Sequence, residues 1–440
     1  MIVSGWGRYP QLDCRVAVPR SDEEVKRLVG EGRVIARGNG RAYGDSAMNL
    51  GQTLDMRGFN HMLAFDAVTG QVVTEAGVLL EDVIAAFLPR GWFPPVTPGT
   101  KFVTIGGMIA ADVHGKNHHK HGSFGSFVDW IDIMTAGGKV VRASREKNRE
   151  LFEWTIGGMG LTGVILRAAF RLRAVETGWI RQTLVPAPNL SAVMKIFADS
   201  QDVTYSVAWI DCLSSGDNLG RSLVMLGEHA MRRDLPLKDS VRPFATPRKR
   251  QLTVPMDAPP LSLNRLTVRA FNEVYYRNGL RHAGDTLIDW DTFFYPLDAI
   301  LHWNRIYGRR GLMQYQCVLP LAQSEAGLRA LLTAIALAGQ GSFLAVLKRF
   351  GVQESRIAFP MEGYTLALDF PVTRRTLALL NDLDRITLAH GGRFYLAKDS
   401  RMSPETLRHS DSRFADFIAM RSATKAGDRF VSVQSERLKI

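Results

Sequence analysis

The chain has 440 residues, of which 46% are hydrophobic and 22% are charged, and these values exclude a disordered protein and predict two folded domains. The net charge of +12 is enough to attract a polyanion or an anionic membrane surface, but the basic residues accompany no nucleic-acid-binding motif, which disfavours nucleic acid as a partner. The three cysteines, Cys14, Cys212 and Cys317, match neither a disulfide framework nor a metal motif and favour a reducing compartment.

A helix and a strand are predicted near the start of the chain. Ser21 and Glu24 have the spacing of a capping box, and apolar residues follow at helical spacing. A strand at 34–37 leads into residues 38–46, GNGRAYGDS, which we call the first glycine loop. Its glycines allow successive main-chain N–H groups to face one anion, although the spacing differs from the Rossmann fingerprint because the third glycine falls one position late. We expect an anion-binding loop, with a merely flexible turn as the alternative.

Short strands and helices alternate through the rest of the first half. Two more glycine-rich segments lie between them, at 104–125 and at 157–163. Three such segments in one α+β half indicate a ligand as long as a dinucleotide that contacts the main chain at several points. The predicted elements are strands at 53–56, 71–75 and 164–173, a helix at 80–88 and a hairpin of strands 129–135 and 139–143.

The segment 104–125, TIGGMIAADVHGKNHHKHGSFG, which we call the second glycine loop, has three interpretations. Its adjacent glycines allow a cofactor to approach the main chain, its four histidines are possible metal ligands, and it is also compatible with a surface loop without chemistry. The spacing of the histidines, H-x3-H-H-x-H, matches no structural zinc pattern. We therefore expect no metal ion.

Longer strands and helices begin near Val175, which predicts a domain boundary. The segment 241–265 contains five prolines and the basic run 248–250, and it predicts a mobile loop that acts as a lid or touches a membrane. A last helix is expected from Pro404 onward. Strands are expected at 205–212, 315–319 and 365–370 and helices at 324–338 and 373–390, as in an antiparallel sheet covered by helices.

Four motifs together resemble the flavin-binding oxidases of the vanillyl-alcohol-oxidase type. They are ARGNGRAYGDS (36–46), PGTKFVTIGGMIAADVHGKNHHKHGSFG (98–125), GGMGLTGVILRA (157–168) and YLAKDS (395–400). Within that family, the chain is similar to the enzymes that oxidise decaprenylphosphoryl-ribose for arabinan precursor synthesis. The resemblance implies a two-domain α+β fold, with an FAD-binding domain made of residues 1–175 and 392–440 and a substrate-binding domain made of residues 176–391.

The resemblance also implies which residues surround FAD. The main-chain N–H groups of residues 38–44 and 104–107 are expected to neutralise its diphosphate. FAD is expected to be bound non-covalently, because the first glycine loop lacks the histidine to which other family members attach it. The expected contacts are Arg37, Gly38, Asn39, Gly40, Arg41, Ala42, Tyr43, Gly44, Asp45, Ser46, Gly99, Thr104, Ile105, Gly106, Gly107, Ala111, Asp112, Val113, His114, Ile165 and Tyr395.

Lys398 is the first catalytic candidate, because a cation beside the flavin can stabilise charge that develops during the reaction. His114 and Tyr43 complete the expected catalytic group. The expected substrate contacts are Lys116, Gln314, Gln316, Lys348 and Lys398, and the two glutamines alternate along a strand so that both point to one face.

Three positions depart from a mycobacterial member of the family. That protein has asparagine, cysteine and tyrosine where this chain has Thr365, Ala367 and Phe294, on what is expected to be the sugar side of the pocket.

The resemblance implies FAD-dependent oxidation of the 2-hydroxyl of a polyprenylphosphoryl-ribose, which a separate NADH-dependent reductase would complete to the arabinose epimer. A flavin oxidase of a soluble sugar, alditol or aldonolactone is the enzymatic alternative, and a nucleic-acid-binding protein is the non-enzymatic one. No secretory signal and no membrane-spanning apolar run is recognised. We therefore expect a cytoplasmic protein that touches the inner face of the membrane.

Overall fold

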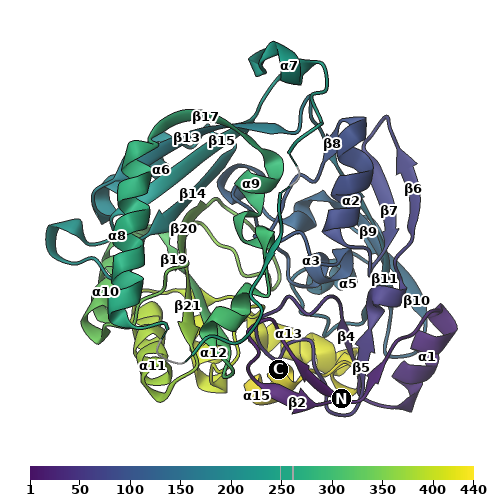
Figure 1. Cartoon of the computed structure of the whole chain (residues 1–440). Coiled ribbons are helices and arrows are strands. Elements are labelled where there is room, and N and C mark those ends of the chain that lie inside the picture. Colours follow the sequence, from purple (N-terminus) through teal and green to yellow (C-terminus); the bar gives the residue numbers. More distant parts are fainter. Residues whose placement is uncertain (248, 260–261) are drawn as a thin grey trace.

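The computed structural model describes residues 1–247, 249–259 and 262–440. Figure 1 shows a large sheet with its helices, in teal and green, beside the smaller sheets of the amino-terminal half, in purple and blue. The last helices, in yellow, lie next to the amino terminus. Antiparallel sheets with separate helices confirm the predicted α+β class. No helix in the described ranges is long and apolar enough to cross a membrane.

A five-stranded antiparallel sheet is the centre of the amino-terminal half. Its buried face packs on the helices that precede and follow residue 100, and Val72, Leu80 and Met108 are fully buried there. The predicted hairpin is confirmed as β9 and β10. The strands, in spatial order, are β10 (Val140–Ser144), β9 (Val128–Met134), β11 (Val164–Arg171), β7 (Gln71–Glu75) and β6 (Met62–Asp66), and the helices are α2 (Leu80–Phe87), α3 (Ile105–Ala110), α4 (His118–His121) and α5 (Arg149–Thr155).

A three-stranded parallel sheet and helix α1 complete this half. The predicted cap is confirmed, because Ser21 Oγ accepts from the N–H of Glu24 at 3.2 Å. The Glu24 carboxylate reaches Arg20 rather than Ser21 and accepts from its N–H at 2.7 Å, so the box is displaced by one residue. The elements are β3 (Val16–Ala17), β5 (Thr53–Asp55), β4 (Ile35–Arg37) and α1 (Asp22–Glu31), and the short pairs β1 (Ile2–Ser4) with β2 (Gln11–Asp13) and β8 (Trp92–Phe93) with β12 (Arg173–Ala174) flank them.

An eight-stranded antiparallel sheet forms the second half, and helices cover one of its faces as predicted. The predicted helix at 324–338 is confirmed at both ends, and it stops because Gly339 adopts a left-handed conformation with φ +64°. The strands, in spatial order, are β17 (Gly284–Asp289), β13 (Trp179–Ala187), β15 (Ser222–His229), β14 (Tyr205–Ile210), β20 (Ala345–Phe350), β21 (Gly363–Pro371), β19 (Leu312–Pro320) and β22 (Arg393–Phe394), and the helices are α6 (Leu190–Asp199), α7 (Leu237–Ser240), α8 (Arg265–Arg281), α9 (Trp290–Phe294), α10 (Ser324–Ala338) and α11 (Arg374–Ala389).

The segment 241–265 is attached to both halves along part of its length. Strand β16 (Leu252–Thr253) pairs in parallel with β18 (Ile300–Leu301), and the Arg8 guanidinium forms an ion pair with the Asp257 carboxylate. Three residues of this segment, Arg248, Pro260 and Leu261, lie outside the described residues.

The carboxyl-terminal tail returns to the amino-terminal half. The N–H of Val34 donates to the carbonyl oxygen of Arg429 at 2.7 Å, and the N–H of Val431 donates to that of Val34 at 2.9 Å. We propose the division into 1–175, 176–391 and 392–440 on this basis, although β22 joins the eight-stranded sheet just after residue 391. The tail contains α12 (Pro404–Ser410), α13 (Arg413–Ala423), α14 (Ala426–Arg429) and α15 (Val433–Leu438).

Arg437 in α15 connects the tail to two loops. Its guanidinium donates to both carboxylate oxygens of Asp45, at 2.8 and 3.0 Å, and to Asp399 at 2.8 Å. Asp45 is 2% exposed. Burial opposes the ionisation of Asp399, but Arg437 and the N–H groups of Arg401 and Met402 hold its pKa below the ordinary value.

We expect Arg437→Ala to lower the free energy of unfolding by about 3 kcal/mol, because it leaves the buried Asp45 carboxylate without its cation. Urea unfolding followed by tryptophan fluorescence measures the change. The matched control is Arg385→Ala, whose exposed pair with Asp382 should contribute less than about 1 kcal/mol. Equal effects of the two substitutions would contradict the role given to Arg437.

Candidate cofactor and substrate site

The first glycine loop lies against residues 395–400, which we call the lysine loop. The N–H of Tyr43 donates to the carbonyl oxygen of Ala397 at 2.9 Å. A Cβ on Gly44 would lie 2.0 Å from the carbonyl oxygen of Asp399, so only glycine permits this approach. Two segments more than 350 residues apart in sequence therefore form one surface.

The first glycine loop also lies against the start of the second. Asn39 Nδ2 donates to the carbonyl oxygen of Phe102 at 2.8 Å. A Cβ on Gly38 would lie 2.1 Å from Thr104 Oγ1, and Thr104 itself is the N-cap of α3. Three of the expected FAD-binding residues, Gly38, Asn39 and Thr104, are thus brought together.

The main-chain N–H groups from Gly38 to Ala42 donate to no protein acceptor among the described residues. The chain turns at Gly40, where φ is +65°. Arg37 connects the loop to strand β1, because its Nη2 donates to the carbonyl oxygen of Ser4 at 2.7 Å. Successive free N–H groups around a left-handed glycine form a site for a phosphate oxyanion.

Arg41 adds a positive charge to this loop. Its guanidinium carbon lies 4.2 Å from the centroid of the Trp6 ring and 5.1 Å from that of Phe102. Its Nε is buried and has no hydrogen-bond acceptor in the described part of the chain. Burial lowers the pKa of Arg41, and the negative charge of Asp298 only partly opposes this shift. An anionic ligand over the loop would satisfy this cation.

One expectation for the second glycine loop is wrong. The N–H of Ile105 donates to the carbonyl oxygen of Val78 at 2.9 Å, and the N–H of Gly106 donates to that of Ala76 at 2.8 Å. These two groups therefore cannot neutralise a diphosphate, because both already donate to main-chain carbonyls of the segment that follows β7. The open positions are Gly99, where a Cβ would meet nothing within 4 Å, and Gly107, where it would meet only Thr104 Oγ1. Flat contact with a large ligand is possible at these two glycines.

His114 lies among aromatic rings on the other side of the site. Its ring centroid is 4.7 Å from that of Phe350 and 5.2 Å from that of Tyr395. Its Nε2 is 3.1 Å from Gln316 Nε2, whereas the buried Nδ1 has no partner among the described residues. Burial lowers the pKa of His114 well below its ordinary value, and the neighbouring Lys348 acts in the same direction. The ring is therefore neutral, with one nitrogen free to face a ligand.

The remaining expected FAD contacts lie near His114, in the core or in the first glycine loop. Tyr395 Oη donates to the carbonyl oxygen of Ala111 at 2.9 Å. The Asp112 carboxylate accepts from Ser123 Oγ and from the N–H of Gly125, which fixes the second half of the loop. Val113 and Ile165 are buried in the core behind the site, and Ser46 is buried in the first glycine loop.

Lys398 reaches the site beside Tyr43. Its Nζ lies 4.0 Å from the centroid of the Tyr43 ring and forms no hydrogen bond with any described residue. Burial lowers the pKa of Lys398, while Asp369 opposes this shift and Lys348 adds to it. The Lys398 ammonium is therefore available to a ligand, and one carboxylate, Asp369, favours its charged form.

Asp369, which sequence reasoning missed, is that carboxylate. It is fully buried in β21, accepts from Gln314 Nε2 at 2.5 Å and keeps Oδ2 without a partner among the described residues. Burial raises its pKa, and Gln314 and Lys398 oppose the shift. The sequence did contain a signal for Asp369. It is the single carboxylate in the mainly apolar run 365–370, TLALDF.

Two further lysines, Lys116 and Lys348, belong to the same electrostatic group. Lys116 Nζ donates to the carbonyl oxygen of Phe293 and lies 4.2 Å from that ring's centroid. Burial lowers the pKa of Lys116 to about 7 and that of Lys348 to about 8, and Lys348 contributes to the shift of Lys116. The cations thus repel one another, and an anion would relieve this repulsion.

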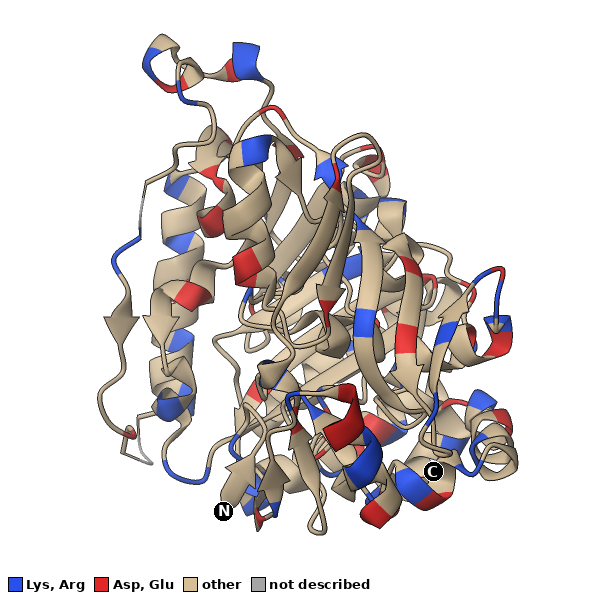
Figure 2. Cartoon of the chain, turned by 90° about the vertical axis from the view of Figure 1, so that its right-hand side faces the viewer, with Lys and Arg blue, Asp and Glu red and all other residues tan. Residues whose placement is uncertain are grey.

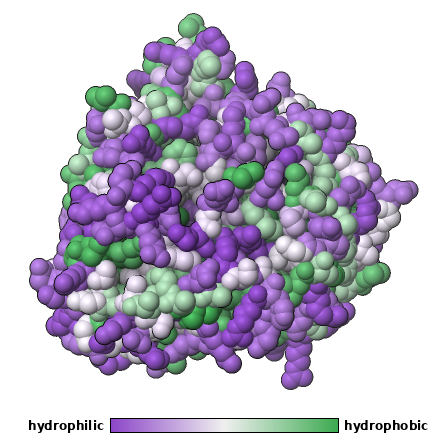
Figure 3. Space-filling model, turned by 180° about the vertical axis from the view of Figure 1, so that it is seen from behind, coloured by the Kyte–Doolittle hydropathy of each residue, from purple (hydrophilic) through white to green (hydrophobic). Residues whose placement is uncertain are grey.

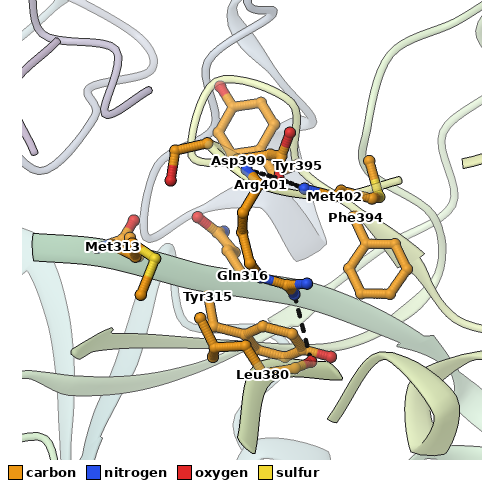
Figure 4. A pocket seen from close by; sticks show the side chains of 11 residues that line it. Met313, Tyr315, Gln316, Leu380, Phe394, Tyr395, Asp399, Arg401 and Met402 are labelled. Carbon is orange, nitrogen blue, oxygen red and sulfur yellow. Dashed lines mark hydrogen bonds between the residues drawn. The ribbon is translucent and has the colours of Figure 1, made fainter. Parts of the chain in front are cut away.

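A small cavity lies next to the site, between β19 and the lysine loop (Figure 4). It is lined by Gln316 of β19, by Tyr395 of the lysine loop, and by Leu380 and Arg401. Its volume of about 20 Å³ holds no more than a water molecule, so it is not the substrate site.

Two other histidines of the second glycine loop have partners within the protein. His118 Nε2 is 2.7 Å from Gln353 Oε1, and His119 Nε2 is 2.8 Å from the carbonyl oxygen of Val203. No group of three or more His, Cys, Asp or Glu side chains in the described ranges is arranged to hold a metal ion.

The departures from the family pattern fall into two environments. Thr365 Oγ1 donates to the carbonyl oxygen of Cys317 and lies 3.3 Å from Gln316 Nε2, next to the expected substrate contacts. Phe294 instead packs on Phe93 and Tyr205 in the core, and it is the neighbouring Phe293 that contacts Lys116.

Comparisons with known proteins identify the ligand of these loops. Residues 15–144 match the FAD binding domain model. The chain is 35% identical to decaprenylphosphoryl-beta-D-ribose oxidase of Mycolicibacterium smegmatis over 99% of this chain and 97% of that protein, and 34% identical to an uncharacterized protein of Streptomyces coelicolor over 82% of this chain and all of that protein. It is also 29% identical to L-gulonolactone oxidase of Bos taurus, over 38% of this chain and 39% of that protein. FAD fits the free N–H groups of 38–42, the unsatisfied Arg41 and the open main chain at Gly99 and Gly107.

We expect Gly38→Ala to reduce the amount of FAD bound per chain, because its Cβ would collide with Thr104 Oγ1 and separate the two glycine loops. Flavin absorbance of the purified protein, compared with its protein concentration, measures the effect. Gly30→Ala is the matched control: a Cβ there meets nothing within 4 Å, and alanine favours helix α1 by about 1 kcal/mol. Full FAD content in Gly38→Ala would contradict the cradle described above.

Proposed function

The chain belongs to the family of FAD-dependent oxidases that includes decaprenylphosphoryl-beta-D-ribose oxidase, and from this membership we propose that it oxidises the 2-hydroxyl of a polyprenylphosphoryl-ribose to the 2-keto sugar. The observation that carries the proposal is the Lys398 ammonium, which lies beside Tyr43 without a hydrogen-bond partner among the described residues. Lys116 and Lys348 supply further positive charge for a phosphate-bearing substrate.

FAD, when bound, supplies the acceptor for the hydride that leaves C2 of the sugar. Residues of the chain bind the hydroxyl group at the same carbon and accept its proton. The Lys398 ammonium can donate to the hydroxyl oxygen and stabilise the negative charge that grows there as its proton departs. Asp369, whose pKa is raised by burial, can accept a proton near neutral pH. Tyr43, whose pKa burial raises well above the ordinary value, remains a neutral wall of the site.

Gln316 and His114 orient the sugar from the opposite side. Gln316 is positioned by His114 and Thr365, and the neutral His114 adds no charge that would compete with Lys398 for an anion. In our proposal these residues, with Gln314 behind Asp369, select a polar ring, and the lysines bind the phosphate.

The keto sugar must be reduced from the other face to complete an epimerisation. We propose that a separate NADH-dependent reductase performs this step. We also propose that the protein works in the cytoplasm at a membrane surface, because a polyprenyl substrate resides in lipid and the net charge of +12 favours an anionic surface.

Steady-state turnover tests the proposed substrate. We expect oxidation of a polyprenylphosphoryl-ribose, with a 2-keto product identified by mass spectrometry, and at least about 100-fold slower turnover of free ribose, alditols and aldonolactones. Preferential turnover of an aldonolactone would favour the alternative, which partial similarity to L-gulonolactone oxidase supports.

Lys398→Ala should bind FAD normally and show about 100-fold slower flavin reduction.

The pH dependence of kcat/KM tests the pairing of Asp369 with Lys398. Asp369 raises the pKa of Lys398, so Asp369→Asn should lower that pKa further and move the alkaline limb of the profile to lower pH. Asp211→Asn is the control, because Asp211 is equally buried but pairs with Arg221 at 2.8 Å. If the alkaline limb of Asp369→Asn coincided with that of the wild type, Asp369 would not govern Lys398.

A further inference from the structure

Helix α8 exposes most of its surface although it has 17 residues. Only Val268, Asn272 and Gly279 are buried in it. Leu266 is 78% exposed and Val274 is 69% exposed, and Leu280 on the same helix is 48% exposed. A helix of a globular protein normally turns such residues toward the core, so this exposed face is expected to contact another molecule or a surface.

The exposed apolar residues of α8 form two adjacent ridges. Leu266, Ala270 and Val274 follow one another at intervals of four residues, and so do Phe271 and Tyr275. Phe271 and Tyr275 are 45% and 39% exposed, and their rings stack on each other at 5.7 Å. The two ridges make one apolar strip along the solvent side of the helix.

The charge on α8 is strongly positive. Arg265, Arg269 and Arg281 form no ion pair with any described residue, and the single acidic residue, Glu273, is already bound by Arg221 and by Arg277. An occupant of this face must therefore be apolar and anionic at once. A bilayer that contains anionic lipids has both properties, since acyl chains receive the apolar strip and headgroups receive the arginines.

The apolar strip is continuous with the reaction site. Tyr43 belongs to the same buried cluster as Tyr307, and Phe343 packs against this cluster. Phe343 stacks on Tyr307 at 5.8 Å and contacts Phe271 of α8 at 5.6 Å. A row of aromatic rings thus connects the lysine site with the exposed helix.

The strip lies on one side of the molecule. Helix α8 and the segment 249–259 are at the front in Figure 1 and at the left edge in Figure 2, where Lys and Arg residues are also present. Leu252 and Met256 of that segment are 56% and 72% exposed. The opposite face, in Figure 3, is mainly hydrophilic, and its hydrophobic residues occur in small groups.

We propose that α8 is the membrane-binding element and that it lies in the interface of an anionic bilayer, with the aromatic row directing the polyprenyl part of the substrate toward Tyr43. This inference rests on the proposed function for its lipid substrate, whereas the binding of α8 to a bilayer is independent of it. The helix, with the exposed Leu252 and Met256 of the segment before it, then holds the enzyme at its substrate.

Co-flotation of the full-length FAD-loaded protein with vesicles tests this assignment. The vesicles contain phosphatidylcholine with a minority of phosphatidylglycerol, and pure phosphatidylcholine vesicles provide the comparison. We expect binding that requires phosphatidylglycerol, and an affinity at least about tenfold weaker in Leu266→Glu/Val274→Glu, because two apolar anchors become anionic. Glutamate is a good helix former, so the helix is preserved.

The matched control is Leu63→Glu/Val68→Glu, which changes two exposed apolar residues of the amino-terminal half by the same charge. It should bind vesicles as the wild type does. The α8 variant should also oxidise a short, water-soluble prenylphosphoryl-ribose at the wild-type rate and lose activity only with the long-chain substrate in vesicles.

Three outcomes would overturn the assignment: no vesicle binding by the wild type, equal loss in both double variants, or a change of oligomeric state in the α8 variant without loss of vesicle binding. The last would identify a second copy of the chain as the occupant. If neither ribose substrate were oxidised while α8-dependent vesicle binding remained, the proposed substrate would be wrong and the membrane assignment would stand.

Discussion

The site depends on one guanidinium near the end of the chain. Arg437 holds the carboxylates of Asp45 and Asp399 together, and each carboxylate belongs to a loop of the site. Asp45 belongs to the first glycine loop, just after the free N–H groups of residues 38–42, and Asp399 is the neighbour of Lys398 in the lysine loop. A buried carboxylate tolerates this position only with a cation beside it. This ion cluster therefore holds the first glycine loop and the lysine loop next to each other.

Positive charge dominates the rest of the site. Lys116, Lys348 and Lys398 all have pKa values lowered by burial, and Asp369 is the carboxylate that opposes the shift of Lys398. Desolvation and mutual repulsion make such a group costly in an empty site. A phosphate-bearing ligand removes much of this cost. The lysine group that we propose to bind the substrate phosphate would thus also make the free enzyme less stable than the liganded one.

Local chemistry made much of the fold predictable. The cap at Ser21, the hairpin 129–143 and the helix 324–338 follow from residue spacing alone, and the motifs led to the loops that meet at the site. Long-range partners were not predictable in this way. Whether the N–H of Gly106 faces a phosphate or the carbonyl oxygen of Ala76 depends on where the segment after β7 lies in the folded chain. Asp369 and the exposed strip of α8 escaped notice for the same reason, because burial is a property of the assembled domains.

The return of the tail also has a consequence for synthesis. At about 5–20 residues per second, residues 1–46 leave the ribosome well before Arg437 is made. The eight-stranded sheet, whose strands lie between residues 179 and 394, can form meanwhile, but the first glycine loop has no Arg437 with which to pair until that residue is made. The first glycine loop and the lysine loop therefore reach their final arrangement only after Arg437 has been made. A chain without Arg437 would form its sheets yet would lack the ion cluster that joins these two loops.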